Sequence, residues 1–191
     1  MAGRRNRECR SVGIGIVIET PRLQFVGLLP GYLDSGDLEQ AVALVAAEVG
    51  PKTGLSPPGG SVLNVLFAAE DEIRALNHEF LGVDGATDVL SFGEDADALP
   101  VDMRPLEEPI VFGELVLCPD YVTRYARRVG TEPAAELLLC FVHGFLHLLG
   151  LDHGTPEEED VMFHLQDRVV RRLGHSPRTT YRGCSAASRQ P

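Results

Sequence analysis

The sequence predicts an α/β fold of the α+β kind, in which a small mixed four-stranded sheet is packed with four to five helices. Two observations predict this class. Segments with strand character alternate along the chain with segments of helical periodicity. Several neighbouring strands also lack the long crossover that joins parallel strands, so we expect antiparallel pairs in the sheet.

The chain has 191 residues, a length that favours one domain. We predict that residues 12–174 form this domain. Residues 1–11 are polar and basic, and residues 175–191 are small or polar without an apolar period. Both ends are therefore expected to be disordered tails.

Four strands are predicted, and β-branched or apolar residues dominate each of them. They cover residues 12–18, 61–68, 87–92 and 110–118. The acidic, proline-rich stretch 93–109 is expected to be an exposed loop.

Helical spacing of apolar residues predicts five helices. They cover about 38–49, 73–80, 120–129, 132–149 and 155–173, with Gly50, Gly130 and Gly174 as expected helix ends. Ile73, Leu76 and Phe80 form the predicted inner face of the second helix. The last helix has a clear start, because Thr155 and Glu158 match a capping box.

Charge and composition restrict the function classes. The net charge of −11 argues against general nucleic-acid binding and gives no indication of DNA binding. The longest apolar run, 137–151, is shorter than a membrane span, and no apolar region follows the basic start. We expect a cytoplasmic protein that does not engage membranes. Its four cysteines form no CxxC pair, so we expect free thiols: Cys9, Cys118, Cys140 and Cys184.

Histidines with ligand spacing lie in the stretch HGFLHLLGLDH, at 143–153. His143 and His147 are four apart on a predicted helix, so both imidazoles face the same side, one turn apart. Gly150 allows the chain to turn, which brings His153 back as a third ligand. Three protein ligands leave a fourth position open, which is typical of catalytic zinc sites. We predict one Zn²⁺ ion, although other transition metals also accept imidazoles.

The same histidine spacing occurs in metzincin peptidases. Those enzymes carry a glutamate directly after the first histidine as general base, whereas this chain has Gly144. A metzincin-like peptidase is therefore the least favoured of the functions considered.

HGFLHLLGLDH resembles the signature of the YbeY family of bacterial endoribonucleases, and every fixed position of that signature matches. Leu76-Asn77, the TDVLSF stretch at 87–92 and the GELVL stretch at 113–117 resemble further family segments in the same order. The resemblance covers about residues 12–174. One departure is Leu81, which stands where many family members have arginine.

The resemblance implies a zinc-dependent endoribonuclease specific for single strands. It also implies a role in 16S rRNA 3′-end maturation and ribosome quality control in the cytoplasm. The expected partners are ribosomal RNA and the small ribosomal subunit, with a ribosomal protein as a further candidate. The zinc-binding helix is expected at the centre of the fold.

The chemistry expected of this site is metal-assisted attack on a phosphodiester, because zinc lowers the pKa of bound water towards roughly 7. Asp152 and Glu114 are the candidate catalytic residues, and Asp152 is also a candidate for orienting a ligand histidine or capping the turn. Thr87 and Ser91 are candidate polar groups of the cleft. The alternative is a non-catalytic ribosome-assembly factor that keeps zinc for folding. Leu81 and the acidic charge favour it.

Overall fold

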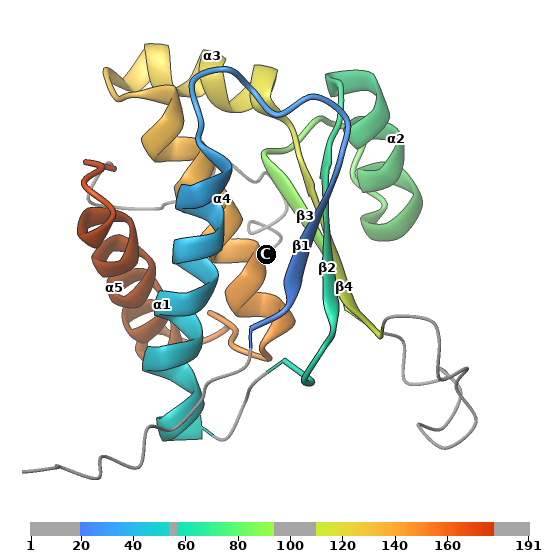
Figure 1. Ribbon diagram of the computed structural model, residues 1–191. Coiled ribbons are helices and arrows are strands. Elements are labelled where there is room, and N and C mark those ends of the chain that lie inside the picture. Colours follow the sequence, from blue (N-terminus) through green and yellow to red (C-terminus); the bar gives the residue numbers. More distant parts are fainter. Residues whose placement is uncertain (1–19, 54–56, 94–109, 178–191) are drawn as a thin grey trace, which may run out of the picture.

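The computed structural model describes residues 20–53, 57–93 and 110–177. The strand predicted at 12–18, the tail at 1–11 and almost all of the loop at 93–109 lie outside these ranges. Most of the tail predicted at 175–191 does as well. The fold is an α+β arrangement of one sheet and five helices within the described residues (Figure 1).

The sheet has four strands in the spatial order β1-β2-β4-β3. They are β1 (Arg22–Val26), β2 (Val62–Phe67), β3 (Val89–Gly93) and β4 (Val111–Leu117). β1 and β4 each run parallel to β2, whereas β3 pairs antiparallel with β4. The mixed four-stranded sheet is therefore confirmed, and β3 lies at its edge.

β1 was not predicted from the sequence. Only two of its five residues, Leu23 and Phe25, pack against the core, and its other residues are exposed. Two apolar positions are too few to produce a clear alternating pattern. The strand is held by its parallel pairing with β2 rather than by a strong local preference.

The five helices are α1 (Ser35–Thr53), α2 (Glu70–Leu81), α3 (Pro119–Val129), α4 (Pro133–Leu148) and α5 (Pro156–Arg172). The capping box of α5 is confirmed, since Thr155 and Glu158 each accept a hydrogen bond from the other's backbone amide. The end predicted at Gly50 was wrong: α1 continues to Thr53. Gly50 is not among the glycines with positive φ, and one glycine inside a helix costs only about 1 kcal/mol.

The predicted inward position of Phe80 was also wrong. Ile73 is fully buried as predicted, but Phe80 is 58% exposed. It lies in the last turn of α2, which ends at Gly82 in the left-handed conformation (φ 70°). The ring meets that of Phe92 at the edge strand β3 but is not enclosed by the core, so helical periodicity alone misplaced it.

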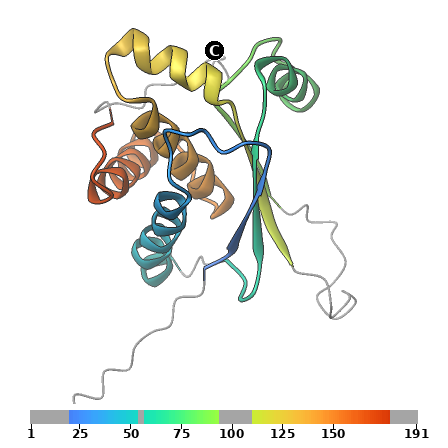
Figure 2. The same ribbon diagram turned by 45° about the horizontal axis from the view of Figure 1, so that its top comes forward.

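Helix α4 lies at the centre of the fold. α1 and α4 lie on one side of the sheet with α5 packed behind them, and α2 covers the other face (Figures 1 and 2). Every residue from Ala135 to Leu146 is buried. Gly144 lets α4 approach the sheet closely, because an added Cβ there would lie 2.8 Å from a methyl carbon of Leu115 and 3.1 Å from one of Val89. The predicted central position of the histidine-bearing helix is confirmed.

Cys118 and Cys140 are buried free thiols, as expected, whereas Cys9 and Cys184 lie outside the described residues. Within the described ranges, no helix combines the length and the hydropathy needed to cross a bilayer.

Candidate metal centre

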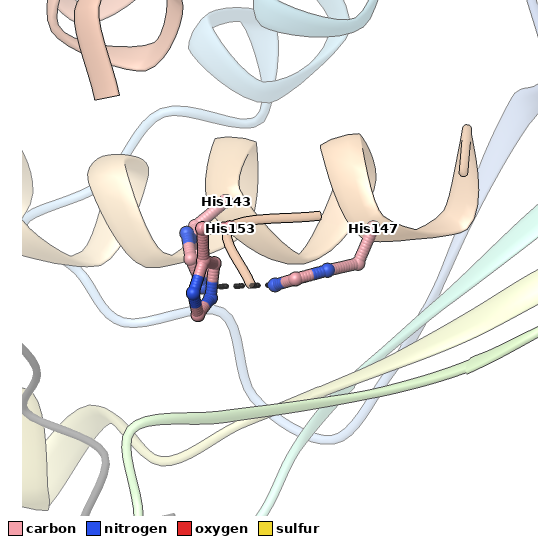
Figure 3. A group of neighbouring side chains, drawn as sticks. All are labelled: His143, His147 and His153. Carbon is pink, nitrogen blue, oxygen red and sulfur yellow. Dashed lines mark hydrogen bonds between the residues drawn. The ribbon is translucent and has the colours of Figure 1, made fainter. Parts of the chain in front are cut away.

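The structure brings His143, His147 and His153 together. The first two lie one turn apart near the end of α4, and Gly150 (φ 81°) then reverses the chain so that the turn before α5 carries His153 to them. One ring nitrogen from each lies within 4.8 Å of the others. Figure 3 shows the three rings converging.

The spacing of these nitrogens fits a tetrahedral ion. Nε2 of His143 lies 3.2 Å from Nε2 of His147. Zinc–nitrogen bonds of about 2.0–2.1 Å at tetrahedral angles separate two ligand nitrogens by roughly 3.3 Å. Three imidazoles are also a donor set that zinc accepts. The residues present therefore suit a zinc ion.

Helix α5 orients the first histidine. Nδ1–H of His143 donates to Oε1 of Gln166 across 3.1 Å, and Gln166 is only 1% exposed. An amide oxygen only accepts, so this bond assigns the proton of His143 to Nδ1 and leaves the Nε2 lone pair facing His147. The ring of Phe163 lies beside His143 and His153, with centroids 6.3 and 5.7 Å away.

Burial keeps the first two histidines neutral. It lowers the pKa of His143 to about 3, and the neighbouring His147 contributes to this shift. Burial also lowers the pKa of His147, with a contribution from His153. Neutral imidazoles have the free lone pair that metal coordination requires.

A cavity of about 690 Å³ opens at the three histidines. Its wall combines the second half of α4, the edge strand β3 and the end of α2. The lining residues are Phe80, Leu81, Thr87, Val89, Leu90, Ser91, Phe92, Gly93, His143, Gly144, His147, Leu148, Asp152 and His153. Thr87 and Ser91 are thus at the cleft, as the sequence suggested.

Comparison with known proteins decides the family. The model of the family described as endoribonuclease YbeY matches residues 33–174. Proteins named Endoribonuclease YbeY from Salinispora tropica and Limosilactobacillus fermentum are similar to this chain. The first is 46% identical over 114 residues, covering 56% of this chain and 71% of the relative. The second is 40% identical over 126 residues, covering 64% and 80%.

The chain belongs to the YbeY family. It is therefore a member of a family of endoribonucleases, as the sequence motifs suggested. The solution structure of TM1509 from Thermotoga maritima is 32% identical with a TM-score of 0.48, covering 79% of this chain and 88% of that protein.

Two motifs that resemble YbeY segments support the site. Asn77 is buried and donates to the carbonyl of Gly85, which holds the turn that leads into β3. Asp88 is fully buried and accepts from Thr87 Oγ1, from the Val89 amide and from Cys140 Sγ. Asp88 therefore ties the start of β3 to α4 at Cys140, which lies three residues before His143.

The two candidate catalytic carboxylates of this YbeY chain lie in different places. Asp152 lines the cavity, and its Oδ1 accepts from the His153 amide at 2.8 Å and lies 3.9 Å from Nδ1 of His147. Glu114 accepts from Asn64 Nδ2 at 3.0 Å. Its neighbours in β4, Gly113 and Leu115, face α4, so Glu114 points to the opposite face of the sheet.

The arginines of α3 and α5 do not line the cavity. Arg124 pairs with Glu70, and Arg168 and Arg172 both pair with Glu48 on α1. Arg171 pairs with Asp167 within α5. Among the described residues that line the cavity, none is lysine or arginine, and Leu81 is one of the apolar residues in that lining.

Sequence reasoning missed Gln166 and Phe163 as parts of this site. A signal for Gln166 was present. It lies on the apolar face of α5 with Met162, Leu165 and Val169, all of them buried. A polar residue on such a face needs a buried partner, and here that partner is a ligand histidine.

Proposed function

We propose that this protein is a zinc-dependent endoribonuclease that cleaves single-stranded RNA, with one Zn²⁺ ion held by His143, His147 and His153. One observation carries the proposal: three imidazoles, two with pKa values lowered by burial, converge at a cavity in a chain of the YbeY family. The cavity volume falls within the usual range of about 300–1,000 Å³ for ligand sites.

A zinc ion there would supply a Lewis acid for a phosphoryl oxygen and lower the pKa of water at its open position. The chain's own side chains orient the ligand histidines and pack beside them. Gln166 fixes the tautomer of His143, and Phe163 packs beside two of the rings. Asp152 is the carboxylate among the described residues that line the cavity, and it is our candidate for accepting the proton of the attacking hydroxyl.

The cavity supports the proposed selectivity for single strands. An unpaired nucleotide can turn its backbone and base into a cavity, whereas the bases of a duplex stay stacked inside the helix. The finer role that we propose is 16S rRNA 3′-end maturation and ribosome quality control in the cytoplasm. The small ribosomal subunit is the expected partner, and a ribosomal protein is a second candidate. This role rests on membership of the YbeY family.

A non-catalytic ribosome-assembly factor is the second candidate. The absence of lysine and arginine among the described lining residues, with Leu81 at the rim, favours it. A peptidase is disfavoured because the position of a metzincin glutamate is Gly144, which is packed against Leu115 and Val89.

Metal analysis and an RNA cleavage assay test the proposal together. We expect the purified protein to carry about one zinc per chain and to cleave a single-stranded RNA but not casein. His143→Ala should lose both the metal and the activity. His164→Ala is the matched control, because His164 lies on α5 with its side chain 75% exposed. A wild-type protein that holds zinc but leaves RNA intact would support the assembly-factor alternative.

A further inference from the structure

Two phenylalanines at the rim of the cavity have no role in the proposed metal chemistry. Phe80, in the last turn of α2, is 58% exposed, and its ring meets that of Phe92 in β3 edge to face, with centroids 4.9 Å apart. We call this pair the aromatic rim. Both residues line the same cavity as the three histidines.

The packing of the domain does not explain the exposure of Phe80. α2 is anchored to the sheet by Ile73, which is fully buried with Leu90 and Val116, and the buried side chain of Asn77 holds the turn that follows the helix. Leu81, the next residue along the chain, is also 54% exposed and lines the cavity. An apolar surface left open beside a reactive site is typical of ligand binding.

The chemistry of the wall identifies the ligand. The described lining contains one carboxylate, Asp152, and no lysine or arginine, so among these described residues none offers a cationic side chain to a phosphate at the rim. An aromatic ring offers a π-face on which any base can stack. Proteins that bind single-stranded RNA commonly turn unpaired bases onto such rings.

We propose that the aromatic rim is a stacking subsite for one unpaired nucleobase of the RNA whose backbone lies at the histidines. The inference rests on the proposed endoribonuclease function and names how that site holds its substrate. Stacking on a ring is tolerant of sequence, so the subsite selects unpaired nucleotides rather than a particular base. Phe80 is the exposed member, and Phe92 supports it from the edge strand.

The absence of tryptophan from the chain makes a direct test possible. Phe80→Trp places a single tryptophan at the rim, and its fluorescence should be quenched when the zinc-loaded protein is mixed rapidly with a short single-stranded RNA. A strand with the same backbone but abasic residues should not quench it. Leu28→Trp is the control, because Leu28 is 90% exposed and does not line the cavity.

Affinity measurements separate stacking from charge. Phe80→Leu keeps an apolar side chain but removes the π-face, so RNA affinity should fall by about fivefold or more. The slope of affinity against salt concentration should not change, because no phosphate contact is lost. Val161→Ala, at a residue that is 62% exposed and outside the cavity, should bind RNA as the wild type does.

The outcomes distinguish this subsite from the proposed function. If RNA quenches the tryptophan of Phe80→Trp while the wild type does not cleave RNA, that result would overturn the proposed endoribonuclease function but support the stacking subsite. Cleavage with unchanged affinity in Phe80→Leu, or equal quenching by the abasic strand, would overturn the subsite and keep the enzyme. Quenching by apolar peptides but not by RNA would assign the rim to a protein partner and also overturn the proposal.

Discussion

Nδ1 of His143 and Oε1 of Gln166 lie 3.1 Å apart and join the second half of α4 to the inner face of α5. Both side chains are buried, so the bond is shielded from water and holds the imidazole in one orientation. Gln166 is therefore a positioning residue for the proposed metal centre, and it lies 23 residues from the histidine that it orients.

Replacing Gln166 should weaken metal binding. Loss of a hydrogen-bond partner behind a ligand histidine typically lowers metal affinity by about 10- to 100-fold. We expect this loss in Gln166→Leu and a partial recovery in Gln166→Glu, which restores an acceptor. Chelator competition measures the zinc affinity directly, without reference to activity. If Gln166→Leu binds zinc as tightly as the wild type, Gln166 has no positioning role.

Acid should destabilise the metal-free protein through His143. Its folded pKa of about 3 lies below the ordinary histidine value of 6.5, so between these values the unfolded chain binds more protons. The free energy of unfolding therefore falls as the pH drops from about 6.5 towards 3, by up to a few kcal/mol. Urea denaturation of the metal-free wild type and of His143→Gln at neutral and acidic pH measures the difference.

The stability loss should be smaller in His143→Gln than in the wild type. His164→Gln is the control for removal of an exposed histidine from α5, and it should keep the wild-type dependence on pH. Parallel stability curves for wild type and His143→Gln would show that His143 does not titrate in this way.

Leu81→Arg should strengthen RNA binding. Leu81 is 54% exposed and lines the cavity, so an arginine has room there and places a cation where the described wall has none. One added phosphate contact makes the slope of log affinity against log salt steeper by about 0.7 for a single strand. Binding titrations at several salt concentrations test this. An unchanged slope would mean that no phosphate passes this position.

Asp152→Asn should show whether Asp152 accepts a proton in the reaction or only holds the turn. Asparagine retains the oxygen that accepts from the His153 amide, so the turn and the zinc affinity should persist. If Asp152 is the general base, the cleavage rate falls by about 10²- to 10⁴-fold. Glu114→Gln should cleave at the wild-type rate, since Glu114 lies on the far face of the sheet. A loss of cleavage in Glu114→Gln but not in Asp152→Asn would assign the general base to Glu114 instead of Asp152.

Most of the helices and three strands could be predicted because their apolar periods are strong. Thr155 marks the start of α5, and Gly130 (φ 75°) marks the end of α3. β1 and the end of α1 could not be predicted. β1 depends on pairing with β2, and Gly50 remained helical although glycine often ends a helix.

The sequence by itself determined the three-histidine group, because helical spacing and a glycine turn are local properties of eleven residues, 143–153. Only the tertiary structure decided what surrounds that group. Gln166 reaches His143 from another helix, Glu114 turns away because strand residues alternate between faces, and Phe80 remains open at the cavity. Such relationships depend on how helices and sheet pack together, so the pattern within one segment does not identify the partner that it meets.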